Sequence, residues 1–178
     1  MTNTWIGLIR GIGPQTHGKM PMAELRNACE KAGMDNVGTV LATGNVIFEA
    51  SGEETQVADK LRDVVASFGL DSDVFLRTYS DISAILDHAP FPDAIAERPN
   101  HVLTMFVDAL INPAARERLL EKNSGPERVT LTDREILIDY PEGVASSRLK
   151  PAVLEKLIGQ KGTARNWNTL LRVAKVDS

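Results

Sequence analysis

The stretch Val37-Gly-Thr-Val-Leu-Ala-Thr-Gly-Asn-Val-Ile-Phe48 holds two short apolar runs on either side of a turn sequence. Val37 to Leu41 and Val46 to Phe48 carry the β-branched and aromatic residues that are typical of strands. The intervening Thr43-Gly-Asn45 is typical of a tight turn, because glycine and asparagine tolerate left-handed backbone conformations. The stretch therefore predicts a β-hairpin, and the rest of the first half is organised around it.

Strand-like and helix-like segments flank this hairpin on both sides. Trp5 to Arg10 reads as a buried strand that ends at Gly11-Ile-Gly-Pro14. Asp73 to Thr78 has side chains that alternate in character and reads as another strand. Between each of these strands and the hairpin, apolar residues recur at helical spacing. They are Met22, Leu25, Cys29 and Ala32 before the hairpin, and Val57, Leu61, Val64, Val65 and Phe68 after it. Residues 1–78 thus read strand, helix, strand, strand, helix, strand, the order of a ferredoxin-like unit.

The same order is repeated in residues 101–178, after a connection at residues 79–100. The connection has helical spacing at first and then three prolines, at positions 90, 92 and 99, that indicate a linker. The second copy contains a strand at His101 to Val107, a helix capped by Asn112, a hairpin about Asp133-Arg134, a helix near Pro151, a short strand at Thr163 to Arg165 and a last helical stripe from Trp167. We predict an α+β protein of two ferredoxin-like (α/β-plait) units with antiparallel sheets, plus a C-terminal helix.

The composition is that of an ordinary globular protein, with 178 residues, 43% apolar and 25% charged. The single cysteine, Cys29, excludes an internal disulfide and a cysteine-based zinc site, and the histidines have no partners at a metal-binding spacing. The N-terminal residues have neither the basic region nor the long apolar stretch of a signal peptide or membrane span. We therefore expect a cytoplasmic location, no membrane partner and no metal site.

Four segments together resemble a known family: Ile9-Arg-Gly-Ile12, Met22-Ala-Glu-Leu-Arg26, Gly44-Asn-Val-Ile-Phe48 and Ala164-Arg-Asn-Trp-Asn-Thr169. Over almost the whole chain the sequence is similar to the bacterial family called domain of unknown function 1697. The resemblance implies two packed α/β-plait units and brings no activity with it. The chain departs from the usual family sequence in two loops, at Gly13-Pro-Gln-Thr16 and at Ala42-Thr43, so the resemblance does not name a ligand for this member.

Charge is unevenly distributed along the chain. The net charge is −4, but residues 1–143 carry 13 basic and 22 acidic residues, whereas residues 144–178 carry 7 basic and 2 acidic ones. The first 23 residues contain Arg10, His17 and Lys19 and no acid. An acidic protein binds nucleic acid poorly without specificity, and aromatic residues make up only 5% of the chain. Nucleic acid is therefore not favoured as a partner, and a small anionic metabolite or a nucleotide fits better.

The two basic stretches would form one anion site if the fold brings them together; otherwise they are solvated surface charges. Asn166 is suited to cap the last helix, whose N-terminus favours an anion, and Arg165 offers a planar fork for phosphate. The alternative is that Asn166 only caps and Arg165 pairs with an acid. The loop Gly11 to Met20 is a weaker candidate. The predicted ligand-binding residues are Arg10, Lys19, Asn45, Arg148, Lys150, Arg165, Asn166 and Asn168.

Two other functions stay open at this point. An enzyme could hold an anionic substrate with the same basic residues and use Ser147 and Lys150, three positions apart on one helical face, as a nucleophile pair. No general base is evident, and no motif names a catalytic residue or a cofactor. A structural protein that oligomerises through its sheet edges is the third interpretation.

Overall fold

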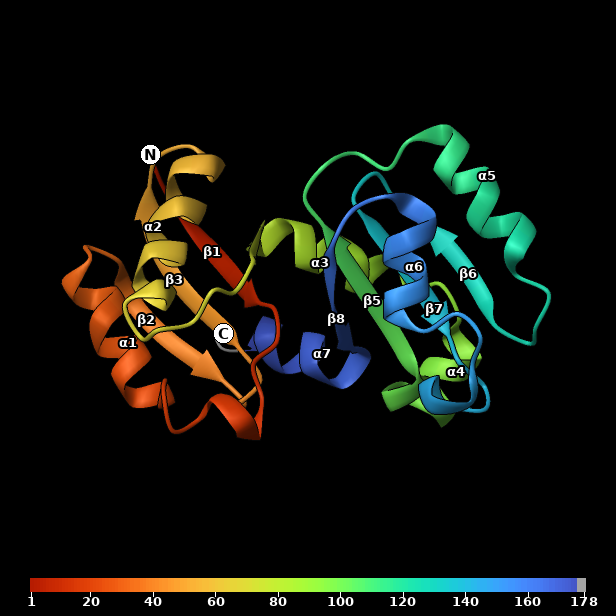
Figure 1. The fold of residues 1–178 in the computed structure, drawn as a ribbon, viewed down its shortest axis with the longest axis horizontal. Coiled ribbons are helices and arrows are strands. Elements are labelled where there is room, and N and C mark those ends of the chain that lie inside the picture. The colour runs from red at the N-terminus through yellow and green to blue at the C-terminus, as the bar shows by residue number, and fades with distance from the viewer. Residues whose placement is uncertain (176–178) are drawn as a thin grey trace. The chain divides into compact units, whose positions relative to one another are not determined.

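The computed structural model describes residues 1–175, which form two compact units (Figure 1). Unit 1 comprises Met1–Leu86 together with the end of the last helix from Leu171 onward, and unit 2 comprises Asp87–Leu170. The sequence predicted residues 101–178 as one unit, whereas this division places the last turn of the C-terminal helix with unit 1. Every helix among the described residues is too short or too polar to cross a lipid bilayer.

Unit 1 contains one four-stranded antiparallel sheet with the strand order β2-β3-β1-β4. This is the order expected for a ferredoxin-like unit, in which each helix connects strands that are not neighbours. The elements are β1 (Thr2–Ile9), η1 (Pro14–Thr16), α1 (Met22–Lys31), β2 (Asp35–Val40), β3 (Asn45–Ser51), α2 (Glu54–Ala66), β4 (Val74–Thr78) and α3 (Tyr79–His88).

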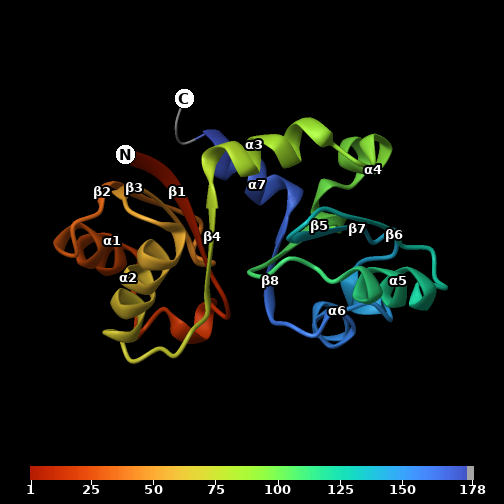
Figure 2. The ribbon, with the colours of Figure 1, turned by 90° about the horizontal axis from the view of Figure 1, so that it is seen from above.

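Helices α1 and α2 cover one face of this sheet (Figure 2). Leu25 and Cys29 of α1 and Leu61 of α2 are fully buried against strand residues such as Phe48. Gly7 in β1 lies directly beneath Leu61, so the helix packs close to the strand there. Burial raises the pKa of the Cys29 thiol to about 12, which makes it an inert core residue.

Unit 2 repeats the architecture with the strand order β6-β7-β5-β8, again antiparallel throughout. Helices α5 and α6 cover one face of the sheet (Figure 2). The short strand predicted at Thr163 to Arg165 pairs with β5 over five residues. The elements are α4 (Pro92–Glu97), η2 (Pro99–His101), β5 (Val102–Val107), α5 (Pro113–Lys122), β6 (Arg128–Leu131), β7 (Glu135–Asp139), η3 (Val144–Ser146), α6 (Pro151–Ile158), β8 (Gly162–Asn166) and α7 (Trp167–Lys175). The predicted fold class is thereby confirmed.

The proline-containing connection is more regular than the linker that the sequence predicted. Pro92 begins α4 and Pro99 begins η2. Proline fits the first position of a helix because the backbone N–H that it lacks would have no partner there. Helix α4 was missed because six residues are too few to show a period.

In each unit the last strand runs directly into a capped helix. Asn166 at the end of β8 accepts a hydrogen bond from the Thr169 N–H at 2.9 Å, so its predicted role as N-cap is confirmed. At the end of β4, the Thr78 N–H donates to Asp81 at 2.8 Å and the Asp81 N–H donates to the Thr78 hydroxyl at 3.1 Å. One residue ahead of each cap stands a buried arginine, Arg77 or Arg165. The two halves therefore repeat each other in detail.

Candidate functional site

Unit 2 contains a polar cavity of about 350 Å³ between two connecting segments. One segment runs from the end of α5 to the start of β6, and the other joins β7 to α6. Both supply charged side chains to the lining. The residues that line the cavity are Lys122, Ser124, Gly125, Pro126, Glu127, Glu142, Ser146, Arg148 and Leu149.

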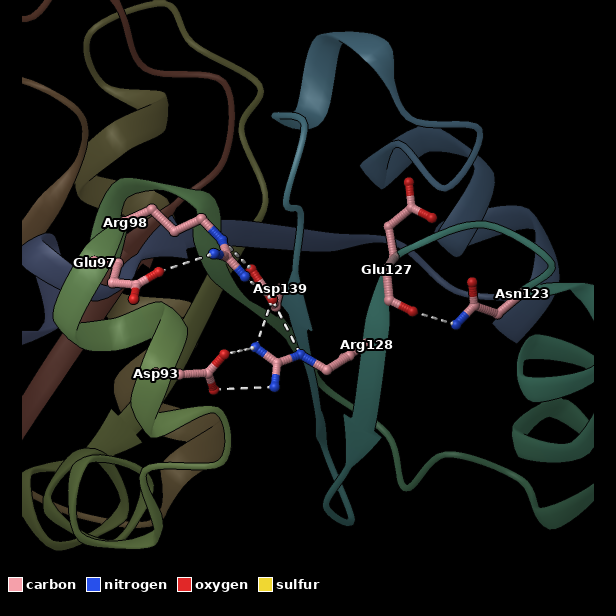
Figure 3. Close-up of polar contacts among 7 residues, drawn as sticks. All are labelled: Asp93, Glu97, Arg98, Asn123, Glu127, Arg128 and Asp139. Atoms are coloured by element: carbon pink, nitrogen blue, oxygen red, sulfur yellow. Dashed lines mark hydrogen bonds and ion pairs between the residues drawn. The ribbon is translucent and has the colours of Figure 1, made fainter.

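One hydrogen bond joins the two segments, and others hold each segment internally. The Ser147 hydroxyl donates to Glu127 Oε1 at 2.6 Å and accepts from the Leu149 N–H at 2.9 Å. The Tyr140 hydroxyl donates to the Leu149 carbonyl at 2.6 Å. Burial, and secondarily the negative charge of Glu127, raise the pKa of Tyr140, so the phenol stays neutral and can donate. Asn123 donates to the Glu127 carbonyl at 2.8 Å (Figure 3). The cavity is therefore built on connected loops.

The segment from Ser147 to Lys150 is not helical, because Ser147 and Lys150 have extended backbone and residues 148–149 form a bend; this corrects the predicted helical pairing of Ser147 with Lys150. Helix α6 begins only at Pro151, and a proline disfavours helical backbone in the residue before it. Burial nevertheless alternates along this segment: Ser147 and Leu149 are buried, while Arg148 and Lys150 are exposed. The serine hydroxyl is engaged by Glu127, and the predicted Ser–Lys pair is not formed.

Three charged side chains of the cavity are not engaged by the protein. Among the described residues, no hydrogen bond or ion pair involves the side chains of Lys122, Glu142 or Arg148. Arg148 stands out, because each of the other arginines of residues 87–170 donates to a protein oxygen; these are Arg98, Arg116, Arg118, Arg128, Arg134 and Arg165.

A second charged cluster of unit 2 is closed on itself (Figure 3). Asp139, which is fully buried, accepts two hydrogen bonds from Arg98, at 3.1 and 2.7 Å, and two from Arg128, at 3.1 and 2.8 Å. Arg128 also donates twice to Asp93, at 3.0 and 2.9 Å, and lies 5.1 Å from the centre of the Phe91 ring. Burial acts to raise the pKa of Asp139, but the hydrogen bonds from both arginines outweigh it and lower this pKa.

The predicted ligand residues of the last strand and helix serve the protein itself. Arg165 is buried in β8 and donates to the Thr163 hydroxyl at 2.6 Å and to the Ala164 carbonyl at 2.9 Å. Burial lowers its pKa to about 10. Asn166 caps α7, and Asn168 donates to Asn100 at 2.7 Å. Of the predicted residues in unit 2, Arg148 lines the cavity and Lys150 follows two residues later.

The remaining predicted residues, Arg10, Lys19 and Asn45, belong to unit 1. Asn45 is fully buried and donates to the Val40 carbonyl at 2.9 Å and to the Thr43 hydroxyl at 3.1 Å, so it holds the hairpin turn. Lys19 is exposed in the loop after η1, and the Arg10 N–H donates to the Asp73 carbonyl. That these residues share one anion site with the basic C-terminal segment stays a prediction.

A glycine is required beside Asn45. Gly44 has φ +85°, and a β-carbon there would lie 2.8 Å from the Ile9 carbonyl. The Ile9 N–H donates to the Gly44 carbonyl at 2.9 Å, so the turn packs directly on the end of β1. The Gly44-Asn45 pair thus has a structural reason, independent of any ligand.

Sequence reasoning missed Lys122, Glu127 and Glu142 as cavity residues. All three are charged residues in or next to connecting segments, where no period or spacing distinguishes a cavity wall from solvated surface. A weak signal was Gly125-Pro126, which marked the first segment as a loop. Within residues 1–175, no group of three or more His, Cys, Asp or Glu side chains is placed to hold a metal ion.

Comparison with known proteins agrees with the repeated architecture. The solved structure of a conserved bacterial protein from Streptococcus pneumoniae is similar, with a TM-score of 0.78 over 99% of this chain and 98% of that one. At 19% sequence identity this similarity shows the fold alone. No curated protein matches the chain. The model of the family described as "protein of unknown function (DUF1697)" matches residues 1–137. The chain therefore belongs to the DUF1697 family, and three of the four segments that indicated it, at residues 9–12, 22–26 and 44–48, lie within the matched residues.

Proposed function

We propose that the protein is a binding module for a small anionic ligand, and that the cavity of unit 2 is the binding site. The observation that supports this function is that Lys122 and Arg148 line the cavity and that their side chains make no hydrogen bond or ion pair to residues 1–175. Cations that the fold leaves unengaged at a concave surface are available to an external anion.

The lining residues suit a phosphate or carboxylate group. The guanidinium of Arg148 can donate two parallel hydrogen bonds to such a group, and Lys122 adds a compact positive charge. Ser124 and Ser146 are exposed in the lining and offer neutral donors. Lys150, exposed two residues beyond Arg148, adds to the local positive potential.

The size of the cavity favours a metabolite over a polymer. Its volume of about 350 Å³ lies near the lower end of the roughly 300–1,000 Å³ that is usual for small-molecule sites. A nucleotide monophosphate or a smaller phosphorylated metabolite fits this range. The Ser147 enzyme hypothesis has less support, because the hydroxyl of that residue is buried and donates to Glu127.

The test is a calorimetric titration of the full chain with a panel of phosphorylated metabolites. We expect Arg148→Gln to weaken binding about tenfold or more, because a hydrogen bond between charged groups contributes about 1.5–3 kcal/mol. Arg172→Gln is the matched control, because this substitution removes the same charge at an exposed position of α7 that belongs to unit 1. Equal losses in the two variants, or no binding of any compound at millimolar concentration, would contradict the proposal.

A further inference from the structure

The cavity holds acids as well as cations, and this restricts the ligand. Each wall contributes one of each sign: Lys122 and Glu127 from the segment before β6, and Glu142 and Arg148 from the segment after β7. Resting on the proposed function, we infer that the ligand is a small zwitterion, with a phosphate or carboxylate group at one end and an ammonium group at the other.

The two carboxylates of the cavity have different roles. Glu127 is half-buried, accepts the hydrogen bond from Ser147 and lies against Gly125, so it belongs to the floor. Glu142 is exposed and, among residues 1–175, is engaged by no hydrogen bond or ion pair. Glu142 is therefore the carboxylate that is open to a cationic group of the ligand.

Electrostatics distinguish a zwitterion from a purely anionic ligand at this site. An anion held by Arg148 and Lys122 lies beside two fixed negative charges, and the repulsion opposes binding. A polyphosphate increases this repulsion with each added charge. A ligand with an ammonium group replaces the repulsion at Glu142 by attraction while it keeps the contacts of its anionic end. The mixed lining thus selects against nucleoside triphosphates and for small amino-phosphates or amino acids.

The experiment compares two ligands that differ in one ammonium group, phosphoethanolamine and ethyl phosphate. Both are titrated into the full chain and into the variants Glu142→Gln and Arg148→Gln. We expect the unaltered protein to bind phosphoethanolamine about fivefold more tightly, the size of one favourable charge pair at a partly exposed site. Glu142→Gln should bring the ratio to about one without weakening ethyl phosphate. Glu117→Gln, an exposed acid on α5 outside the cavity lining, should leave the ratio unchanged.

The variants separate this inference from the proposed function. If Arg148→Gln weakens both ligands but the unaltered protein does not prefer phosphoethanolamine, the anion site stands and the zwitterion is wrong. A preference that survives in Glu142→Gln also overturns the inference. If neither ligand binds the unaltered protein in the millimolar range, the anion site and the inference fall together. Thermal unfolding of each variant checks that the exposed substitutions leave the fold intact.

Discussion

Two regions of unit 2 each combine two cations with carboxylates, and they differ in whether those charges are engaged. The closed cluster holds Asp93, Arg98, Arg128 and Asp139, with the exposed Glu97 3.7 Å from Arg98, and the cavity holds Lys122, Glu127, Glu142 and Arg148. In the closed cluster each of the first four groups is hydrogen-bonded to another of them. Among the charged side chains of the cavity, only that of Glu127 has a hydrogen-bond partner within residues 1–175. A mixed set of charges therefore says little about function until its internal bonds are known.

The backbone explains the difference. Arg128 and Asp139 stand directly opposite each other in the β6–β7 ladder, and helix α4 brings Asp93 to the same guanidinium (Figure 3). Strand pairing and helix α4 thus bring three of the partners to bonding distance, and Arg98 follows directly after α4. The cavity residues lie mainly on connecting segments, where Arg148 is exposed between the buried Ser147 and Leu149. We therefore expect the first region to stabilise the fold and the second to be available to a ligand.

The largest expected effect is the loss of the buried carboxylate of the closed cluster. Asp139→Asn leaves Arg98 and Arg128 facing a neutral amide, and we expect the free energy of unfolding to fall by about 2–3 kcal/mol. This is less than the full cost of breaking a buried pair, because both arginines are partly exposed. Denaturation by urea measures the change. Asp133→Asn, at an exposed acid near Arg116, is the control and should have little effect. Equal changes in the two variants would mean that the closed cluster does not stabilise the unit.

A smaller loss of stability is expected when the Ser147 hydroxyl beside the cavity is removed. Ser147→Ala removes the hydrogen bond to Glu127 and leaves the Leu149 N–H without its acceptor, so unfolding should become easier by about 1–2 kcal/mol. Ser146→Ala, at an exposed neighbour, should leave stability unchanged. A Ser147→Ala variant as stable as the unaltered protein would show that these bonds do not hold the cavity together, and that the hydroxyl serves another purpose.

The contrast between the two regions also shows what sequence could and could not predict. Strands and helices followed from apolar periods, and Asn112 and Asn166 marked two helix starts that the structure confirms with hydrogen bonds to Ala114 and Thr169. The central pair of the closed cluster could have been predicted. Residues equally distant from the predicted turn at Asp133-Arg134 face each other in the hairpin, and Arg128 and Asp139 are such a pair.

The cavity could not be predicted from the sequence in the same way. Its charged residues come from two segments that meet only in the tertiary structure, and loop charges follow no period. Arg165 was proposed as a ligand residue from its charge, but strand alternation with Ala164 places it on a buried position of β8. The sequence shows that a cationic side chain is present. Whether that side chain is bonded within the protein depends on which face of its strand or helix it lies on.

The smallest expected change in stability comes from closing the cavity, and it tests the comparison most directly. Ser146→Glu adds a carboxylate to the lining two residues before Arg148, so the arginine gains an internal partner as in the closed cluster. Because Ser146 is exposed, the free energy of unfolding should change by less than about 0.5 kcal/mol. Binding of a phosphorylated ligand should nevertheless weaken about fivefold or more, since the new carboxylate competes for Arg148 and repels the anion. Titration of this variant beside Ser146→Ala separates the added charge from the lost hydroxyl, and undiminished binding in Ser146→Glu would mean that engagement of Arg148 does not decide whether the cavity accepts an anion.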